Sequence, residues 1–426
     1  MWRNWTGDQS CAPARRSNPT TAAEVAAALV DAGSRGETVR VVGAGHSFGD
    51  NVVTDGTLMS LDALAGMQVL DAAEGRVRVA AGTRLFDLNR LLDEHGLAMA
   101  NLGDINVQSA AGAISTGTHG TGAALGNLAT FVESAEIVTA DGSIRELSGD
   151  ELRAARISVG ALGVITAYTL RTVPAFKLHE RRDRMPLTAL LRDLDGHVHG
   201  NDHFEFFIFP HATEAITKGL NRTDEPAGVR SKARAYVEEV VLENYALDVL
   251  SRAGRRFPTQ IPRLNRLVTS LASPSDKVNH SYDVFSSPRM VRFTESEWAF
   301  PRETAPEALQ EILAMITRRG FDINFPIEVR FVAGDTDSML SPAYGRDTTY
   351  LAVHAYQDMA WREYFSAVQE IALAHGARPH WGKRHSLDAD TLSTLYPEWE
   401  AFNAVRTDLD PEGRFANAHI TRIFGS

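Results

Sequence analysis

The segment Gly43-Ala44-Gly45-His46-Ser47-Phe48-Gly49-Asp50 follows a predicted buried strand, Val39 to Val42. Glycine lets a backbone turn tightly, adopt positive φ angles and approach a ligand closely. Successive N–H groups in such a turn can bind an anion such as a pyrophosphate. The segment therefore predicts a ligand-binding turn directly after a strand in the first third of the chain.

Two more segments concentrate glycine with small or hydroxyl residues. They are Gln108-Ser109-Ala110-Ala111-Gly112-Ala113-Ile114-Ser115-Thr116-Gly117-Thr118-His119-Gly120-Thr121-Gly122 and Gly160-Ala161-Leu162-Gly163-Val164-Ile165. Any one of the three could be an ordinary turn, because glycine punctuates loops freely. Three of them early in the chain, with His46 and His119 embedded, indicate a binding site for a phosphate-containing cofactor.

The first segment is not a Rossmann fingerprint. It reads G-x-G-x-x-x-G, and the residues after it do not open a helix, whose N-terminus that fingerprint requires. An NAD-dependent dehydrogenase is therefore disfavoured. The chain also lacks G-x-x-x-x-G-K-[ST], so the sequence does not support a P-loop nucleotidase.

Strands and helices alternate in both halves of the chain, which predicts an α+β fold of two domains. We expect a cofactor domain at 1–173, a substrate domain with a large antiparallel sheet at 174–375, and a C-terminal segment at 376–426 that returns to the cofactor domain. Predicted elements include helices from Thr21 to about Gly33 and over 361–375, a hairpin at Asp141-Gly142, and strands at 204–209, 290–300, 321–331 and 350–356. Residues 222–232 are polar and predict a loop or an ordered lid.

Composition excludes several functional classes. Acidic residues (54) outnumber Lys and Arg (43), giving a net charge of −11 that argues against broad nucleic-acid binding. A single cysteine, Cys11, rules out an intramolecular disulfide and a cysteine-based metal centre. No apolar run reaches the roughly 18 residues of a membrane span, and the N-terminus does not read as a signal peptide, so we expect a cytoplasmic protein. Peripheral attachment to a membrane remains compatible with the sequence.

Together the three glycine-rich segments resemble the FAD domain of the vanillyl-alcohol-oxidase-type flavoproteins. In the second half, Ile327-Glu328-Val329-Arg330 and His380-Trp381-Gly382-Lys383 resemble the aldonolactone oxidoreductases. That family includes oxidases and dehydrogenases of L-gulono- and D-arabinono-1,4-lactone and is close to the alditol oxidases. The resemblance covers nearly the whole chain, from Trp5 to Phe424.

The resemblance implies an FAD site in the N-terminal domain. Family members with histidine at the position of His46 hold FAD covalently through its 8α-methyl group, and a neutral imidazole is a suitable nucleophile near neutral pH. The second segment would run along the isoalloxazine ring and the third would contact the adenine half. The residues so implied are His46, Gly43, Ala44, Gly45, Ser47, Phe48, Gly112, Ala113, Ser115, Thr116, Gly117, His119, Gly120, Gly163 and Ile165.

Oxidation of a carbinol sends a hydride to flavin N5, and the hydroxyl group must lose its proton near a cation. Arg330 and Lys383 are the candidates, and Glu328 shares a strand face with Arg330 at spacing i, i+2. A nearby Arg330 and partial burial would both lower the pKa of Lys383, so that a neutral amine could accept the proton. Lys383 would then assist deprotonation or hold the alkoxide. Tyr356, His354 and His380 are expected to line the substrate site.

Two details refine this interpretation. By short-motif alignment, alditol oxidases have a serine on the substrate side of the flavin where this chain has Ala113, which favours a lactone over an alditol. His197, His199, Asp202 and His203 cluster in the sequence, but without a third ligand at convincing spacing they predict a polar loop and no metal site.

We therefore expect FAD-dependent oxidation of an aldono-1,4-lactone at its C2 hydroxyl, giving an ascorbate-type product. Electrons would pass to O2 or to another acceptor such as a cytochrome or a quinone. An alditol oxidase that makes an aldose and hydrogen peroxide is the alternative with the same fold. A non-catalytic flavin- or sugar-binding protein is disfavoured, because mere binding needs no cationic pair beside a flavin.

Overall fold

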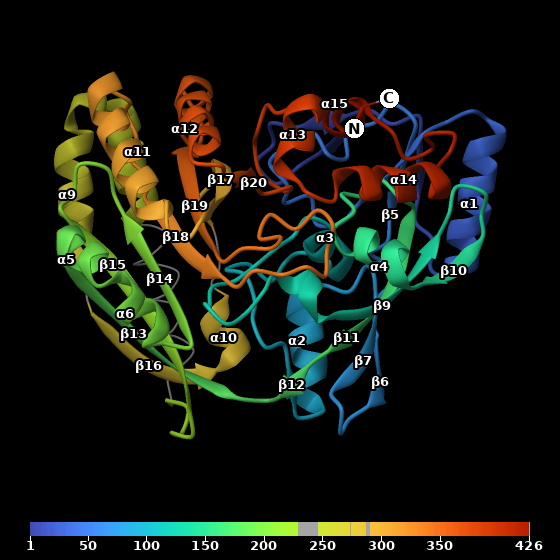
Figure 1. Ribbon diagram of the computed structural model, residues 1–426, viewed down its shortest axis with the longest axis horizontal. Coiled ribbons are helices and arrows are strands. Elements are labelled where there is room, and N and C mark those ends of the chain that lie inside the picture. Colours follow the sequence, from blue (N-terminus) through green and yellow to red (C-terminus); the bar gives the residue numbers. More distant parts are fainter. Residues whose placement is uncertain (229–245, 273, 287–289, 426) are drawn as a thin grey trace.

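The computed structural model describes residues 1–228, 246–272, 274–286 and 290–425 (Figure 1). Its N-terminal part contains two main sheets. The smaller sheet is parallel, with the order β3 (Arg15–Ser17), β5 (Thr57–Ser60), β4 (Val39–Val42). The larger is antiparallel, with the order β10 (Ile144–Leu147), β9 (Val132–Val138), β11 (Val164–Arg171), β7 (Arg76–Ala80), β6 (Met67–Asp71).

Short helices and strand pairs complete this part. Helix α1 (Ala22–Ser34) begins where predicted, because the Thr21 hydroxyl accepts the N–H of Glu24 at 3.2 Å. The Glu24 carboxylate returns to the N–H of Thr20, one residue earlier than a capping box requires. The other elements are β1 (Trp2–Arg3), β2 (Ser10–Cys11), α2 (Leu85–Glu94), β8 (Leu97–Ala98), α3 (Ala110–Ser115), the 3-10 helix η1 (Leu128–Phe131), α4 (Gly149–Arg156) and β12 (Val173–Pro174).

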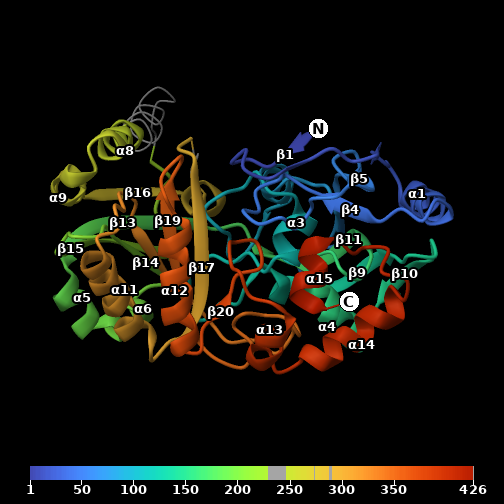
Figure 2. The same ribbon diagram turned by 90° about the horizontal axis from the view of Figure 1, so that it is seen from above.

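The second part is built on an eight-stranded antiparallel sheet. Its order is β16 (Ser275–His280), β13 (Lys177–Pro186), β15 (Glu214–Thr223), β14 (His203–Ile208), β18 (Ile327–Val332), β19 (Thr348–Tyr356), β17 (Phe293–Pro301), β20 (Arg378–Pro379). Figure 2 shows four helices gathered on one face of this sheet: α5 (Leu187–Arg192), α6 (Leu194–His199), α11 (Ala305–Arg319) and α12 (Arg362–Ala374).

The remaining helices lie in two groups. One group belongs to the large sheet: α8 (Ala246–Arg256), the 3-10 helix η3 (Pro258–Gln260), α9 (Ile261–Leu271) and α10 (Ser281–Phe285). The other is the C-terminal group, which lies over the N-terminal part in Figure 1: α13 (Ala389–Leu395), α14 (Trp399–Leu409) and α15 (Ala418–Phe424). No helix of the described ranges is both long and apolar enough to cross a membrane.

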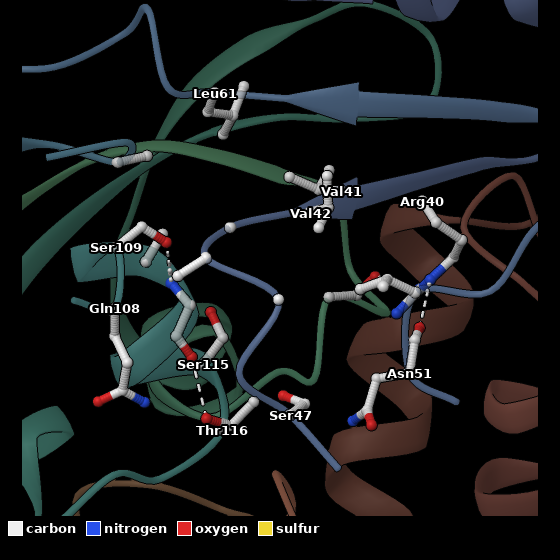
Figure 3. Close-up of a pocket in the computed structure, with 18 of the residues that line it drawn as sticks. Arg40, Val41, Val42, Ser47, Asn51, Leu61, Gln108, Ser109, Ser115 and Thr116 are labelled. Atoms are coloured by element: carbon white, nitrogen blue, oxygen red, sulfur yellow. Dashed lines mark hydrogen bonds between the residues drawn. The ribbon is translucent and has the colours of Figure 1, made fainter. Parts of the chain in front are cut away.

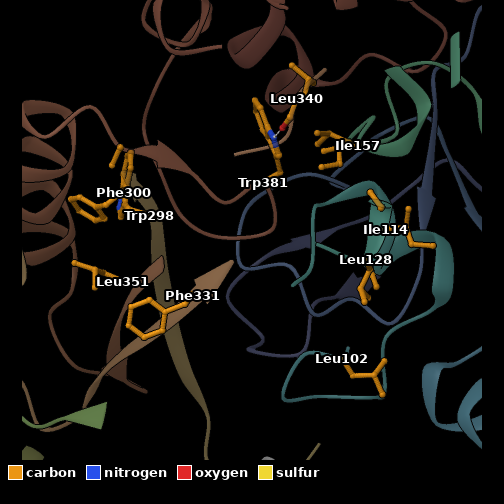
Figure 4. Close-up of a cluster of buried hydrophobic side chains, with 14 of the residues drawn as sticks. Leu102, Ile114, Leu128, Ile157, Trp298, Phe300, Phe331, Leu340, Leu351 and Trp381 are labelled. Atoms are coloured by element: carbon orange, nitrogen blue, oxygen red, sulfur yellow. Dashed lines mark hydrogen bonds between the residues drawn. The ribbon is translucent and has the colours of Figure 1, made fainter. Parts of the chain in front are cut away.

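One continuous hydrophobic core joins the two parts (Figure 4). Phe331 and Trp298 of the large sheet belong to the same buried cluster as Ile114 and Leu128 of the N-terminal part. Trp381 is fully buried in this cluster and donates its indole N–H to the carbonyl of Leu340 at 2.7 Å. Burial of the HWGK segment in the core fixes the chain on either side of it, which positions Lys383.

Three local predictions need correction. The strand predicted over 321–331 begins only at Ile327, because Pro326 lacks an N–H for the ladder and the carbonyl of Ile323 binds the side chain of Asn265. The predicted polar loop around His197 and His199 is the end of α6, with Val198 buried. The loop predicted over 222–232 starts as strand, since β15 runs to Thr223, and its residues 229–232 lie outside the described ranges.

A buried arginine ties distant segments together around the first glycine-rich turn. Arg40, on β4, is 2% exposed and donates to the carbonyls of Asn51 (2.9 Å), Val159 (3.0 Å), Gly160 (2.9 Å) and Phe415 (2.6 Å). Burial lowers the pKa of Arg40 to about 10, so the guanidinium stays charged at neutral pH. The turn, the third glycine-rich segment and the C-terminal region therefore depend on one side chain.

We expect Arg40→Met to reduce the free energy of unfolding by about 3 kcal/mol or more, because it leaves several buried carbonyls without a donor. Urea denaturation followed by circular dichroism measures the change. Arg90→Met is the matched control, because Arg90 is exposed on α2 and, within the described ranges, forms an ion pair with Glu94 alone. The control should shift the free energy of unfolding by no more than about 0.5 kcal/mol. An equal loss of unfolding free energy in the two variants would contradict the stabilising role that we assign to the Arg40 hydrogen bonds.

Candidate active site

The first glycine-rich turn leaves β4 and packs against helix α3. Gly45 has φ +69°, a backbone conformation that favours glycine. A Cβ on Gly43 would lie only 2.3 Å from the hydroxyl oxygen of Ser109, the N-cap of α3. The residues after the turn do not form a helix, as predicted. Glycine is thus required in this turn for its conformation and for its close approach to α3.

A groove lined by residues of all three glycine-rich segments has about 1040 Å³ of empty space, part of it open to solvent (Figure 3). Val159 in its wall has φ +51°, which is rare for a β-branched residue, and the bond from Arg40 to its carbonyl holds it there. Of the residues predicted to contact the cofactor, the groove is lined by Gly43, Ala44, Gly45, His46, Ser47, Gly112, Ser115, Thr116, Gly163 and Ile165.

Other predicted cofactor residues lie elsewhere. Phe48 and His119 line a second cavity. Ala113 is fully buried in the core and lines neither the groove nor that cavity, so the argument that its missing hydroxyl favours a lactone does not hold. Gly117 and Gly120 also lie outside both linings, and a Cβ on Gly120 would clash with the carbonyl of Leu102 at 2.3 Å. These two glycines shape the turn.

The second cavity encloses about 1090 Å³ and meets the groove at His46, Ser47, Gln108 and Thr116, which line both. Two hydrogen bonds hold the glycine-rich turn against the HWGK segment. Phe48 donates its N–H to the carbonyl of Gly382 at 2.9 Å, and the Asn51 side chain donates to the carbonyl of Trp381 at 3.0 Å. These bonds bring Lys383 beside the end of the groove that carries His46.

His46 is a neutral, weakly held side chain at this junction. Its ring stacks on Trp5 with 5.2 Å between centroids, and it has no hydrogen bond to any residue that the structure describes. Burial, with the nearby charges of Arg84 and Lys383, lowers its pKa to about 4. One nitrogen of the neutral ring therefore has a lone pair available for nucleophilic attack at neutral pH.

Alternation along β18 separates core residues from cavity residues. Val329 and Phe331 face the core, whereas Glu328 and Arg330 line the cavity, as the i, i+2 spacing predicted. The Arg330 guanidinium contacts Asp104 at 2.6 Å, Glu205 at 3.1 Å, and Glu328. Although burial alone would lower the pKa of Arg330, these carboxylates raise it well above its usual value. Arg330 is thus a permanent cation held by three anions.

Lys383 differs from its prediction. Its Nζ lies 2.6 Å from the Glu295 carboxylate and 3.8 Å from that of Glu297, both on β17. Burial and Arg330 would lower the pKa of Lys383, as we expected, but the two carboxylates outweigh them and raise the pKa above its usual value. The expectation of a partly neutral amine is therefore wrong, because it did not include the two glutamates. Lys383 is an ammonium group at neutral pH.

Glu297 also joins two histidines. His119 Nδ1 donates to the carbonyl of Gly120 at 2.8 Å, and His119 Nε2 lies 3.1 Å from Glu297 Oε1. Burial alone would raise the pKa of Glu297, but His119 and Lys383 hold it well below its usual value. The other carboxylate oxygen, Glu297 Oε2, lies 4.0 Å from His380 Nε2.

His119, Glu297 and His380 are close enough together to suggest a metal site, since one ligand atom from each lies within 4.8 Å of the others. The hydrogen bonds argue against it. His380 Nδ1 accepts the N–H of Gly382 at 3.0 Å, so the proton of the neutral ring is on Nε2, the atom that faces Glu297. That atom has no lone pair for a metal ion. Asp104, Glu205 and Glu328 form a second such group, but the guanidinium of Arg330 binds all three.

The predicted substrate residues divide into two sets. His354 and His380 line the cavity, and His354 Nδ1 donates to the carbonyl of Pro326 at 2.9 Å. Tyr356 is 1% exposed, stacks on Phe325 and donates its hydroxyl to Asp248, so it lies outside the cavity lining. Tyr356 and His354 stand at i, i+2 on β19, as predicted, but the cavity lining does not extend as far as the Tyr356 ring.

Sequence reasoning missed four carboxylates: Asp104, Glu205, Glu295 and Glu297. A signal existed for two of them, because Glu295 and Glu297 stand at i, i+2 in a predicted strand that also carries the large apolar residues Phe293, Trp298 and Phe300, and a buried carboxylate needs a partner. Asp104 and Glu205 come from separate segments that only the fold brings to Arg330.

Comparisons with known proteins agree with this geometry. A family model described as D-arabinono-1,4-lactone oxidase matches residues 168–423, and an FAD binding domain model matches residues 13–148. L-gulono-1,4-lactone dehydrogenase of Mycobacterium tuberculosis is 47% identical and covers 100% of this chain and 99% of its own. L-gulonolactone oxidase of Bos taurus is 33% identical over 99% of this chain and 98% of its own.

Another relative and a solved structure are also similar to this chain. Alditol oxidase of a Streptomyces species is 32% identical over 98% of this chain and 97% of its own. The crystal structure of cholesterol oxidase from B. sterolicum superposes with a TM-score of 0.81 at 17% identity, covering 99% of this chain and 96% of that chain. This last likeness concerns the fold alone and confirms the predicted α+β, vanillyl-alcohol-oxidase-type architecture.

The two family models together span nearly the whole chain, and the full-length identities extend through both the groove and the charged cavity. The chain therefore belongs to the D-arabinono-1,4-lactone oxidase family of FAD-linked oxidoreductases.

Proposed function

We propose that this enzyme oxidises an aldono-1,4-lactone, such as L-gulono- or D-arabinono-1,4-lactone, at its C2 hydroxyl. The observation that carries the proposal is the set of cations and carboxylates on β17, β18 and the HWGK segment, in a cavity that opens onto the cofactor groove at His46. Such a wall can bind several hydroxyl groups at once. The names of the 47% and 33% identical relatives support a lactone as the substrate class.

The residues present fit FAD. The glycine-rich turn from Gly43 to Phe48 offers backbone N–H groups to the pyrophosphate, and Gly163 with Ile165 would contact the adenine half. His46 stands where the groove meets the cavity, so the flavin ring would face the substrate there. When bound, FAD supplies the hydride acceptor. We also propose the division into a cofactor domain (1–173), a substrate domain (174–375) and a returning segment (376–426).

The protein's own side chains bind and orient the substrate. Arg330 donates to substrate oxygens from a position fixed by three carboxylates, while Glu328 accepts from a substrate hydroxyl. The Lys383 ammonium donates to the oxygen of the reacting carbinol and stabilises the charge that develops there. Because Lys383 is already protonated, the hydroxyl proton goes to a carboxylate oxygen of Glu295, the anion that touches Lys383.

An alditol oxidase remains the alternative. Ala113 no longer argues against an alditol substrate, because this residue is buried in the core. In addition, a full-length relative at 32% identity is named alditol oxidase. The relatives are named both dehydrogenases and oxidases, so O2 and a cytochrome or quinone are both candidate acceptors.

Substrate class is tested by anaerobic bleaching of the flavin absorbance. If the enzyme oxidises lactones in preference to alditols, L-gulono-1,4-lactone should bleach the band near 450 nm (roughly where oxidised flavin absorbs). Xylitol should leave that band unchanged on the same timescale. Bleaching by xylitol alone would favour the alditol oxidase. A yellow protein that neither compound bleaches would exclude both substrate classes while leaving the FAD assignment in place.

We further propose that His46 holds FAD covalently, because its ring is neutral, faces the groove and has no hydrogen-bonded partner among the described residues. Acid precipitation should leave flavin on the wild-type protein and release it from His46→Ala. His354→Ala is the matched control, a histidine of the same cavity that should keep its flavin attached. Flavin that is released equally from the wild type and both variants would exclude the bond.

Lys383→Met should lower the rate constant of flavin reduction by about 10²–10³-fold, the usual effect of losing one donor to a developing oxyanion. Stopped-flow spectroscopy at saturating lactone measures it, with the flavin content unchanged. Lys383→Arg, which keeps the charge, should lose less. If the neutral amine were the base instead, Lys383→Arg would be as impaired as Lys383→Met, because a guanidinium does not deprotonate at these pH values.

A further inference from the structure

Helices α8 and α9 form a surface that the oxidation chemistry does not use. They pack against each other beside the large sheet, on the side away from α11 and α12 (Figure 2). Large apolar side chains are exposed on both helices and on the link between them, at fractions of 63% for Val249 on α8, 57% for Phe257 directly after α8, and 45% for Leu267 and 64% for Leu271 on α9. Single exposed apolar residues need no explanation, but four along one continuous segment indicate a contact surface.

Arginines are interleaved with these apolar residues at helical spacing. On α8, Val249, Arg252 and Arg256 stand at i, i+3, i+7 and share one face, and all three are exposed. On α9, Arg263, Leu267 and Leu271 stand at i, i+4, i+8 and are exposed, as is Arg266 at i+3. The opposite face of α9 is buried, through Ile261, Asn265 and Thr269. Both helices are thus amphipathic, with their outer faces basic and apolar.

Among the residues that the structure describes, few acids balance these charges. Arg252 pairs with Asp248, and Arg255 pairs with Asp358. Arg256 lies over the ring of Phe257, while Arg263 donates to the neutral side chain of Gln260, and neither has an ion pair among the described residues. The helical pair is therefore a local cationic surface on a chain whose net charge is −11.

We propose that the outer face of α8 and α9 binds the surface of a membrane that contains anionic phospholipids. Arginines attract the headgroups, and the exposed Val, Phe and Leu side chains enter the boundary between headgroups and acyl chains, as in interfacial amphipathic helices. A second copy of the chain fits this surface poorly, because a two-fold contact would place arginine against arginine. Leu247 of the same helix lines the substrate cavity, so the membrane face and the cavity share α8.

Vesicle flotation of the FAD-loaded protein tests the proposal independently of substrate or turnover. We expect the protein to float with phosphatidylcholine vesicles that contain roughly 30% of the anionic lipid phosphatidylglycerol. It should not float with vesicles of phosphatidylcholine alone. Added salt should weaken binding, because it screens the arginines. Arg263→Glu/Arg266→Glu should lower the partition coefficient at least tenfold, at roughly a factor of five for each arginine lost. Leu267→Ser/Leu271→Ser should weaken binding as well, in a way that lowering the salt does not restore.

Two control variants carry the same chemical changes elsewhere. Arg90→Glu/Arg318→Glu alters the net charge equally on α2 and α11, and Leu70→Ser/Phe86→Ser removes two comparably exposed apolar side chains. Both should float like the wild type. Absence of flotation with anionic vesicles, equal losses in test and control variants, or a dimer that the α9 substitutions dissociate would each overturn the proposal.

Discussion

A single buried guanidinium holds the cofactor groove together. Arg40 donates to the carbonyl of Asn51 just after the first glycine-rich turn, to those of Val159 and Gly160 at the start of the third segment, and to that of Phe415, 375 residues along the chain from Arg40. A buried charge is stable only where its donors are satisfied, so these segments must stay in register with one another. Val159 shows the effect directly, because its positive φ is held by this contact.

The same turn connects the groove to the chemistry. Its N–H at Phe48 and the side chain of Asn51 bind backbone carbonyls of the HWGK segment, whose Trp381 is anchored in the core. Lys383 is therefore placed beside the His46 end of the groove by backbone contacts on one side and by apolar burial on the other. The shared core between the two parts of the molecule makes this junction rigid.

Carboxylates dominate the electrostatics of the substrate cavity. Arg330 and Lys383 are each flanked by more than one anion, and both keep raised pKa values in spite of burial. Both groups are therefore cations at neutral pH, where they can bind and stabilise negative charge. In the mechanism proposed above, proton acceptance falls to a carboxylate and the two cations position the substrate.

The sequence by itself determined the class of fold, the nucleotide-binding turns and the strand that carries Glu328 and Arg330, because glycine conformation and strand alternation are local properties. It also identified the HWGK segment and His46. The surroundings of these residues arise only in the tertiary structure. The pKa of Lys383 depends on Glu295 and Glu297, almost 90 positions earlier, and Ala113 was displaced from its expected place by helix packing. Electrostatic environment and burial arise from contacts between segments distant in sequence, and no local pattern encodes them.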